Sequence, residues 1–269
     1  MGKILNILGG RRVTPSDSGY DVFLVAGQSN ALGAGVGYDH ILDAPHPSVH
    51  QFAGSGRNKD RVLIGEYPFW HHTRAPGVGF GQTFGKLHAE ATGRPVLLVP
   101  AARGESGFYP HGGYTWDLED VTGASNLYRF AVWQLYIAIT ANPANVLRGI
   151  LWHQGEADTW HLNQDEYAKK LDTLIKGFRS EFGTAPFILG QMSPDRMKDG
   201  FAEGITGYPL IDAAHRDTPN RMPMTAFVEA PSGMFNSDAD KLHFSAAGQR
   251  ELGRRYYDAY RRLQGQPTS

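Results

Sequence analysis

The chain of 269 residues contains no cysteine, no long apolar run and no large excess of charge of either sign. Without cysteine, disulfides, a thiolate nucleophile and a cysteine-ligated metal site are excluded. No stretch reaches the roughly 18 consecutive apolar residues that a membrane-spanning helix requires, so we expect no membrane partner. The formal net charge of -1 comes without a dense lysine and arginine run. This balance argues against a nucleic-acid partner.

The first ten residues contain a few apolar side chains and lead directly into Arg11 and Arg12. This stretch is too short for a secretory signal, whose apolar region alone spans about 7–15 residues. We therefore expect a soluble protein without an encoded export signal. Such a protein would be cytoplasmic, or leaderless and associated with a virion.

Short apolar runs alternate along the chain with longer amphipathic segments. Continuously apolar runs are typical of strands that are covered on both faces of a sheet. The predicted strands are Val22–Ala26, Val96–Val99, Gly149–Trp152, Pro186–Leu189 and Met224–Val228, with a weaker one at Val49–Ala53. The predicted helices are Gly79–Ala91, Asn126–Ala141, Gln164–Phe182 and Ser245–Leu263.

Strands that alternate with helices predict βαβ units and a parallel sheet. We expect one domain over residues 1–269, with its core at about 20–265, folded as a three-layer α/β/α sandwich around about five parallel strands. Two long segments, 38–77 and 105–125, are rich in Gly, Pro and aromatic residues, and loops of this length usually carry function. In an open parallel sheet, the site lies at the carboxyl ends of the strands.

The first predicted strand leads directly into Gly27-Gln28-Ser29-Asn30. Gly27 permits a tight turn from strand to helix, after which Ser29 would begin a short helix. In that position its hydroxyl projects from the strand end, and its N–H points to where an oxyanion can bind. Taken alone, the pattern is also that of a serine that caps a helix.

Asp240 precedes His243 by three residues, in a predicted loop just before the last helix. At this spacing the carboxylate can accept a hydrogen bond from Nδ1–H of the histidine. This bond fixes the tautomer and leaves Nε2 free to accept a hydroxyl proton. Asp238 is the alternative orienting residue, although the three-residue spacing favours Asp240. A capping aspartate beside a surface histidine would produce the same pattern.

Two further strand ends carry polar groups. Gly104 follows the strand predicted at 96–99, and its N–H is a candidate donor to an oxyanion. Gln154 and Glu156 follow the strand predicted at 149–152. The amide of Gln154 is a second candidate donor, and the carboxylate of Glu156 can anchor neighbouring loops by hydrogen bonds. Taken by itself, a glycine in a loop indicates only a turn.

Metal ligation by His153, Glu156 and Asp158 is conceivable from their spacing. However, the sequence contains no second ligand cluster with the spacing of a zinc site. We therefore expect no metal.

In this chain order, the motifs together resemble the SGNH hydrolase superfamily. They are Gly27-Gln28-Ser29-Asn30, then Gly104, then Trp152-His153-Gln154-Gly155-Glu156, and then Asp240-Lys241-Leu242-His243-Phe244. Within the superfamily they look like the branch of carbohydrate esterases that contains sialate O-acetylesterases and acetylxylan esterases. That branch carries Gly-Gln-Ser-Asn and Gln-Gly-Glu at the corresponding places. The resemblance extends over residues 21–248.

The resemblance implies a flavodoxin-like α/β/α sandwich, no cofactor, and hydrolysis of O-acetyl esters of a carbohydrate through an acyl-enzyme. In that family pattern, Ser29 is the nucleophile, His243 is the general base and then acid, and Asp240 orients the histidine. The backbone N–H groups of Ser29 and Gly104, with the side chain of Gln154, would form the oxyanion hole.

An acetylated carbohydrate is therefore the expected substrate and partner. The long loops contain many aromatic side chains, whose faces suit sugar rings, although large aromatic residues are also frequently buried. The residues expected to support the site are Gln28, Asn30 and Glu156. The candidate substrate contacts are Arg103, Trp116, His153 and Trp160.

Other functions remain compatible with these residues. A general carboxylesterase for small acyl esters, or a lipase-like hydrolase, would have an apolar groove in place of polar loops. An acyltransferase with the same triad would have a dry, closed site. A non-catalytic carbohydrate-binding module would carry the site as a relic. The sequence specifies neither the acetylated glycan nor the oligomeric state.

Overall fold

The computed structural model describes residues 12, 14–54, 56–73 and 77–266, and the amino-terminal segment discussed above lies outside them. A seven-stranded sheet forms the centre, in the order β3-β2-β4-β1-β7-β8-β9. Its strands are β1 (Asp21–Gly27), β2 (Val49–Ala53), β3 (Arg61–Ile64), β4 (Val96–Pro100), β7 (Val146–His153), β8 (Phe187–Gly190) and β9 (Thr225–Val228). Neighbouring strands are parallel, except that β3 pairs antiparallel with β2.

The predicted strands all belong to this sheet, and the mainly parallel α/β fold is confirmed. Without β2 and β3, the order of the strands in the sheet is β4-β1-β7-β8-β9. This is the flavodoxin-like order 2-1-3-4-5, in which the second strand lies at the edge of the sheet beside the first. The sheet is larger than the expected five strands. β3 was not predicted because its apolar run, Val62-Leu63-Ile64, is only three residues long and is followed at once by Gly65.

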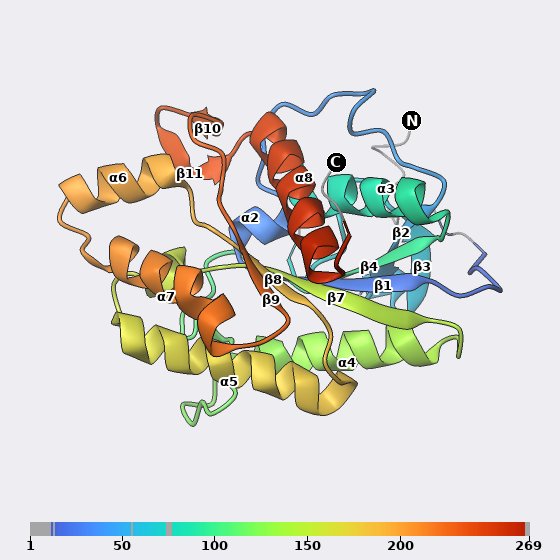
Figure 1. Ribbon diagram of the computed structural model, residues 1–269, viewed down its shortest axis with the longest axis horizontal. Coiled ribbons are helices and arrows are strands. Elements are labelled where there is room, and N and C mark those ends of the chain that lie inside the picture. Colours follow the sequence, from blue (N-terminus) through green and yellow to red (C-terminus); the bar gives the residue numbers. More distant parts are fainter. Residues whose placement is uncertain (1–11, 13, 55, 74–76, 267–269) are drawn as a thin grey trace.

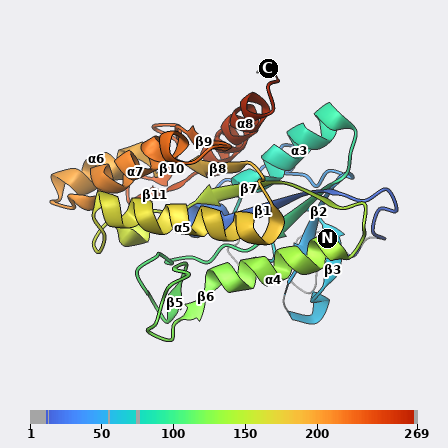
Figure 2. The same cartoon turned by 60° about the horizontal axis from the view of Figure 1, so that its bottom comes forward.

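Helices cover both faces of the sheet (Figure 1). α3 (Phe80–Thr92) and α8 (Ala246–Leu263) pack against each other on one face. α4 (Leu127–Thr140), α5 (Gln164–Phe182) and α7 (Gly207–Arg221) lie on the other face, and the turned view of Figure 2 shows the two layers on opposite sides. On α5, apolar residues at helical spacing form a buried stripe, which consists of Tyr167, Leu171, Leu174, Ile175 and Phe178. These contacts form one hydrophobic core on each side of the sheet.

The four predicted helices form within one residue of their predicted ends, and side-chain caps mark three of the starts, including that of α5 at Asn163. The side chains of Asn126 and Ser245 accept the N–H groups of the third helical residue of α4 and α8. α6 (Pro194–Ala202) and α7 were not predicted. Among the residues of α6, only Gly200 is buried, so this helix has no apolar stripe. α7 buries residues at helical spacing, but polar His215 and Thr218 occupy two of these positions and Pro219 lies within the helix, which obscures the pattern in the sequence.

Short elements surround the carboxyl ends of the parallel strands. They are α2 (Ser29–Leu32), the pair β5 (Tyr114–Thr115) and β6 (Ser125–Asn126), the 3₁₀ turn Glu156–Asp158, and the hairpin of β10 (Phe235–Ser237) and β11 (Asp240–Phe244). The hairpin corrects one expectation, because Asp240 and His243 lie in a strand rather than in a loop. None of the helices in the described part of the chain is both long and apolar enough to cross a membrane.

A buried ion cluster fixes the amino end of β1. The carboxylate of Asp21 accepts bonds from Nε2 of His88 at 2.8 Å, Nε of Arg94 at 2.8 Å and Nε of Arg148 at 3.0 Å. The Asp21 side chain is only 3% exposed. Burial opposes its ionisation, but the three bonds outweigh burial and lower the pKa of Asp21. The cluster therefore ties β1 to α3, to β7 and to the segment that precedes β4.

Candidate active site

Ser29 begins α2 directly beyond the carboxyl end of β1. The turn requires glycine at position 27, where φ is +125° and a Cβ would lie 2.0 Å from the carbonyl oxygen of His153 on β7. Ser29 is half-buried. Because it is the first residue of the helix, its N–H has no acceptor within α2. The structure thus places Ser29 in the predicted turn from strand to helix, with its backbone N–H unused by the helix.

The β10–β11 hairpin brings His243 to Ser29. Nε2 of His243 lies 3.0 Å from Oγ of Ser29, and Nδ1 lies 2.9 Å from Oδ1 of Asp240. Asn236 donates to Oδ2 of Asp240 at 2.9 Å. Burial favours protonation of Asp240, but the bonds from Asn236 and His243 outweigh burial and lower its pKa. The ionised carboxylate accepts Nδ1–H and leaves Nε2 to accept the serine proton, whereas the alternative residue Asp238 is exposed.

Gly104, the candidate backbone donor, lies beside α2. The N–H of Arg103 donates to the carbonyl of Gly27 at 3.1 Å, which joins the segment after β4 to the end of β1. A Cβ on Gly104 would lie 3.8 Å from the side chain of Leu32 in α2. The guanidinium of Arg103 donates to the Gly104 carbonyl at 2.9 Å and covers the ring of Tyr114 at 3.7 Å. Arg103 therefore holds the Gly104 peptide.

Gln154 occupies a different place from the one expected. The side chain is fully buried. Nε2 lies 2.8 Å from Oδ2 of Asp158 and 3.3 Å from both Oε1 of Gln28 and the carbonyl of Ser106. Oε1 accepts from the hydroxyl of Tyr167 at 2.7 Å. Because both amide hydrogens are directed at these acceptors, the contacts of Gln154 do not support the expected role as an oxyanion donor. They make it a link between the turns after β1 and β7.

Gln28 and Glu156 join the segment that carries Ser29 to the turn after β7. Oε1 of Gln28 accepts from the N–H of Ala157 at 3.2 Å and from that of Gly155 at 3.4 Å. Oε1 of Glu156 accepts from the side-chain amide of Asn30 at 3.1 Å. The supporting roles expected for these three residues therefore correspond to contacts between the turn after β1 and the turn after β7.

Asp158 anchors the loop that follows β4. Its buried carboxylate accepts the N–H of Phe108 at 2.9 Å and that of Tyr109 at 2.8 Å, in addition to the amide of Gln154. Burial raises the pKa of Asp158 to about 6, although these bonds act in the opposite direction. In the described residues, no group of three or more His, Asp or Glu side chains is placed to hold a metal ion.

Two expected substrate contacts are corrected by their burial. Trp116 and His153 have no exposed surface. Nε1 of Trp116 donates to Oγ of Ser106 at 3.0 Å, and Nε2 of His153 bonds the carbonyl of Gln191 at 2.9 Å. Burial lowers the pKa of His153 and so favours the neutral ring, which donates from Nε2. Both side chains are core residues beneath the site. Trp160, in contrast, is 68% exposed.

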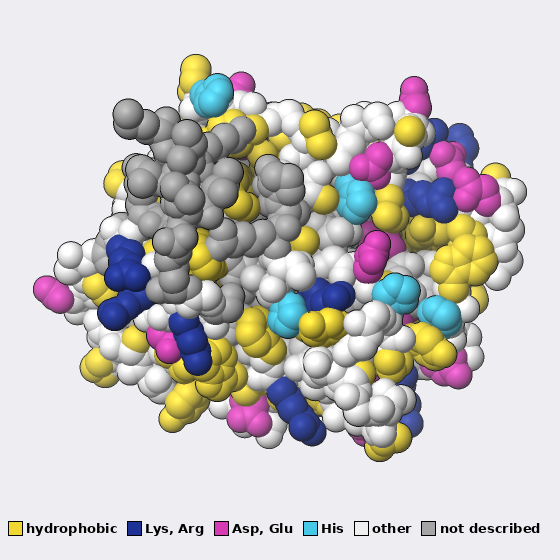
Figure 3. Space-filling view, turned by 180° about the vertical axis from the view of Figure 1, so that it is seen from behind, with side chains coloured by type: hydrophobic (Ala, Val, Ile, Leu, Met, Phe, Trp, Pro, Cys, Tyr) yellow, Lys and Arg dark blue, Asp and Glu magenta, His cyan; other side chains and the backbone are white. Residues whose placement is uncertain are grey.

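A cavity of about 340 Å³ adjoins the triad on the side of α6 and α7. Gln28 and Leu242, which precede Ser29 and His243, line it together with Trp160. Glu156, Arg196 and Tyr208 contribute polar groups to its walls. The carboxyl ends of the strands lie at the left of Figure 1 and therefore at the right of Figure 3, where histidine, acidic and hydrophobic side chains lie close together.

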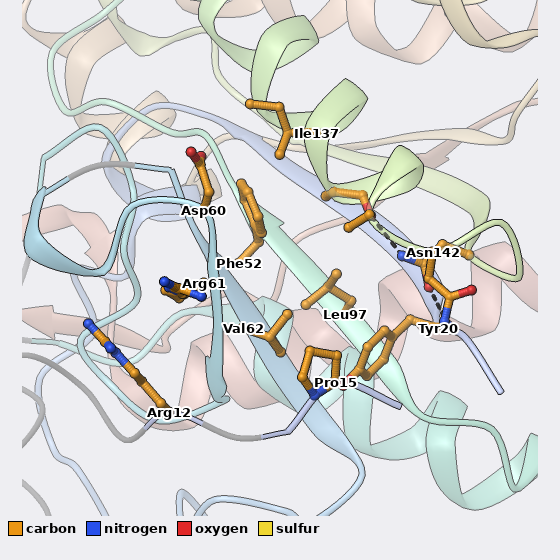
Figure 4. Close-up of a pocket in the computed structure, with 13 residues that line it drawn as sticks. Arg12, Pro15, Tyr20, Phe52, Asp60, Arg61, Val62, Leu97, Ile137 and Asn142 are labelled. Atoms are coloured by element: carbon orange, nitrogen blue, oxygen red, sulfur yellow. Dashed lines mark hydrogen bonds between the residues drawn. The ribbon is translucent and has the colours of Figure 1, made fainter. Parts of the chain in front are cut away.

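A second cavity, of about 220 Å³, lies near the amino ends of β1 and β7 (Figure 4). Tyr20, Phe52, Leu97 and Ile137 give it a mainly apolar lining. Among the described residues, no serine or histidine lines this cavity. The cavity at the carboxyl ends is therefore the one that adjoins the candidate chemistry.

Three side chains near the site were not assigned a role from the sequence. Asn236 binds Asp240, Tyr208 lines the cavity, and Arg196 donates from Nε to the Tyr208 hydroxyl at 3.3 Å. Asn236 lies four residues before Asp240, which is no recognisable spacing for a histidine orienter. Arg196 and Tyr208 belong to the two helices that were not predicted.

Comparison with known proteins gives the family. The model of a carbohydrate esterase family, sialic acid-specific acetylesterase, matches residues 19–262. A probable 9-O-acetyl-N-acetylneuraminic acid deacetylase of Escherichia coli is 27% identical over 199 residues. That match spans 60% of this chain and 60% of the relative.

Solved structures share the fold. NanS superposes with a TM-score of 0.75 at 20% identity, over 94% of this chain and 99% of that chain. A carbohydrate acetylesterase from Xanthomonas citri superposes with a TM-score of 0.62 at 18% identity, over 90% of this chain and 56% of that chain. The family match covers the whole seven-stranded sheet and the residues Ser29, Asp240 and His243. The chain therefore belongs to the sialic acid-specific acetylesterase family of carbohydrate esterases.

Proposed function

We propose that the protein is a serine O-acetylesterase that removes acetyl groups from a carbohydrate. One observation carries the proposal: a single imidazole bonds Oγ of Ser29 on one side, at 3.0 Å, and the carboxylate of Asp240 on the other, at 2.9 Å. This is the geometry of a serine nucleophile with a base of fixed tautomer. Membership of the family supports an acetylated carbohydrate as the substrate.

In the proposed mechanism, Oγ of Ser29 attacks the acetyl carbonyl while Nε2 of His243 takes its proton. Asp240 stabilises the imidazolium that forms. The backbone N–H groups of Ser29 and Gly104 receive the oxyanion, and each preorganised donor contributes roughly 10²–10³ in rate. His243 then protonates the departing sugar oxygen. In the second half, water attacks the acetyl-serine while His243 takes its proton; the bond from the carbonyl carbon to Oγ then breaks, His243 returns the proton to Oγ of Ser29, and acetate leaves.

The sugar would bind in the cavity beside the triad. Trp160 and His161 line this cavity, and Trp160 offers it an exposed aromatic ring. The ring of His161 stacks on that of Tyr109, with the ring centroids 4.0 Å apart and the ring planes at 10°. Glu156 and Arg196 add polar groups to the walls. The walls therefore combine apolar surface with a few polar groups, as small-molecule sites commonly do. The expected contact at Trp160 is thus retained in the proposal.

Acetate release tests the proposal. Wild type is assayed with p-nitrophenyl acetate, acetylated sialic acid and acetylated xylan, beside Ser29→Ala. Ser237→Ala, on exposed β10 surface, is the matched control. We expect Ser29→Ala to lose a factor of about 10³ or more, as removal of a triad member implies, and the control to match wild type. If wild type releases no acetate from any ester but binds glycans, the protein is a binding module and the proposal is wrong.

A further inference from the structure

The side chain of Asn30, which follows Ser29 directly, is fully buried between α2 and β11. Nδ2 donates to the carbonyl of Leu242 at 3.1 Å and to Oε1 of Glu156 at 3.1 Å. Oδ1 accepts the N–H of Phe244 at 3.2 Å and Nε2 of Gln249 at 3.3 Å. A primary amide has two hydrogens and two acceptor lone pairs, so the bonding capacity of Asn30 is fully used.

The bonds to Leu242 and Phe244 hold the backbone immediately before and after His243. Successive N–H groups of a strand point to opposite edges. The N–H of Ser245 donates toward β10, to the carbonyl of Met234 at 2.9 Å, so that of Phe244 points away from β10. The amide of Asn30 therefore pairs with the open edge of β11, as a third strand would. Because Ser29 and Asn30 are consecutive residues, this pairing fixes the backbone of the base relative to the nucleophile.

Asn236 holds the other strand of the hairpin. In addition to its bond to Asp240, Nδ2 donates to the carbonyl of Ala34 at 3.1 Å. Oδ1 accepts the N–H of Val36 at 2.8 Å. The segment after α2 is thereby joined to β10. The hairpin that carries Asp240 and His243 is thus attached at two points to the segment that carries Ser29, each time by the amide of an asparagine.

We propose that Asn30 is a positioning residue of the reaction, which sets the separation of Ser29 Oγ and His243 Nε2 by holding the backbone on both sides of His243. The inference rests on the proposed triad. Asn30 has no exposed surface, so it acts through His243 and not on the substrate. Glu156 completes the arrangement, because its carboxylate fixes the orientation of the Asn30 amide.

Asn30→Asp tests the inference, because it keeps the shape and removes the N–H groups. One carboxylate oxygen would then face the Leu242 carbonyl and the Glu156 carboxylate, which repel it. A displacement of the base by about 1 Å is expected to lower kcat on p-nitrophenyl acetate by roughly 10², with KM little changed. Asn163→Asp, at the capping position of α5, is the matched control and is expected to retain the wild-type kcat, since aspartate caps helices as well.

The double variant Asn30→Asp with Glu156→Gln reverses the donor and acceptor of the broken bond. The amide introduced at position 156 donates to the carboxylate introduced at position 30. We expect this to recover kcat by roughly tenfold over Asn30→Asp alone, which a merely structural loss would not allow. Recovery of folded protein without recovery of kcat per folded molecule would overturn the inference.

Asn30→Ala keeps the test open if Asn30→Asp does not fold, because it removes the bonds without adding repulsion. Its kcat per folded molecule, with folding checked by circular dichroism, is expected to fall by at least tenfold. A wild-type kcat in Asn30→Ala overturns the positioning role. Failure of the triad itself is recognised separately, since Ser29→Ala would then remain active.

Discussion

Replacement of Asp240 by Asn tests how the structure fixes the tautomer of His243. In the wild type, Oδ2 of Asp240 accepts from Nδ2 of Asn236 at 2.9 Å, while Oδ1 faces Nδ1 of His243. In Asp240→Asn, we expect the single carbonyl oxygen to accept from Asn236, whose bond of 2.9 Å is shorter than the 3.3 Å bond from the backbone N–H of His243 to Oδ1, so the new NH₂ group faces Nδ1. The ring must then accept at Nδ1 and carry its proton on Nε2, which blocks it as a base.

The size of the effect follows from charge and geometry. A carboxylate and an imidazolium 2.9 Å apart interact by roughly 1–6 kcal/mol for effective dielectric constants of about 80 to 20. The Asp240 side chain is 36% exposed, so a value of about 3 kcal/mol in the middle of this range is appropriate. Loss of the charge alone, in Asp240→Ala, should therefore lower kcat/KM roughly 10²-fold. Asp240→Asn, which also imposes the wrong tautomer, should lose at least a further tenfold.

The assay is the rate of p-nitrophenyl acetate hydrolysis for both variants, normalised to folded protein. Asp238→Asn is the control, because Asp238 is exposed, and it should retain the wild-type rate. An Asp240→Asn variant that is more active than Asp240→Ala would refute the tautomer argument. Rates within threefold of wild type in both would refute the role of Asp240 altogether.

Three further measurements address stability and substrate binding. Asp21→Asn removes the carboxylate that accepts from the buried His88 and from the half-exposed Arg94 and Arg148, and it should lower the free energy of unfolding by about 1–3 kcal/mol in urea titrations at pH 7. Because folding lowers the pKa of Asp21, its ionised carboxylate contributes to the free energy of unfolding above its unfolded-state pKa of 3.8, and this contribution is lost as the pH falls below 3.8 toward the folded-state pKa. If the stability of the variant and that of the wild type fell equally with acid, this assignment would be contradicted. Burial raises the pKa of Asp158 to about 6, so protonation of this carboxyl contributes to the free energy of unfolding below pH 3.8, and the contribution is lost as the pH rises through 6. Asp158→Asn should remove this dependence of stability on pH between about 4 and 6, and an unchanged dependence in the variant would contradict the assignment. Trp160→Ala should raise KM for the acetylated sugar roughly 2- to 10-fold and leave p-nitrophenyl acetate hydrolysis unchanged, whereas equal loss on both esters would place Trp160 outside the sugar site.

The sequence alone predicted which candidate site residues lie at the carboxyl ends of strands. Ser29 follows an apolar strand, and the carboxyl ends of parallel strands meet at one edge of the sheet. The three-residue spacing of Asp240 and His243 is local, so their bond was also predictable. That these two segments meet, across more than 200 positions of the chain, was expected only from the resemblance to a family.

Other features depend on packing that a local pattern does not encode. His153 ends β7, a strand that is buried along its carboxyl-terminal half, and Gln154 continues into the interior. Their residue types suited a ligand site, but their side chains point into the core. Trp116 is buried because it packs in the core against the ring of Trp152, from a loop without periodicity. The role of Asn236 arises because its strand pairs with β11, which no spacing in the sequence specifies.

The central claim is that Ser29 becomes acetylated during turnover. Wild type is mixed with p-nitrophenyl acetate, quenched in acid within the first turnover, digested and examined by mass spectrometry, beside Ser29→Ala. The account predicts one acetyl group on the peptide that contains Ser29 in the wild type. In Ser29→Ala it predicts no acetyl group on this peptide and no release of acetate. Acetate release that persists in Ser29→Ala, or an acetyl group on another residue that turns over at the catalytic rate, would contradict it.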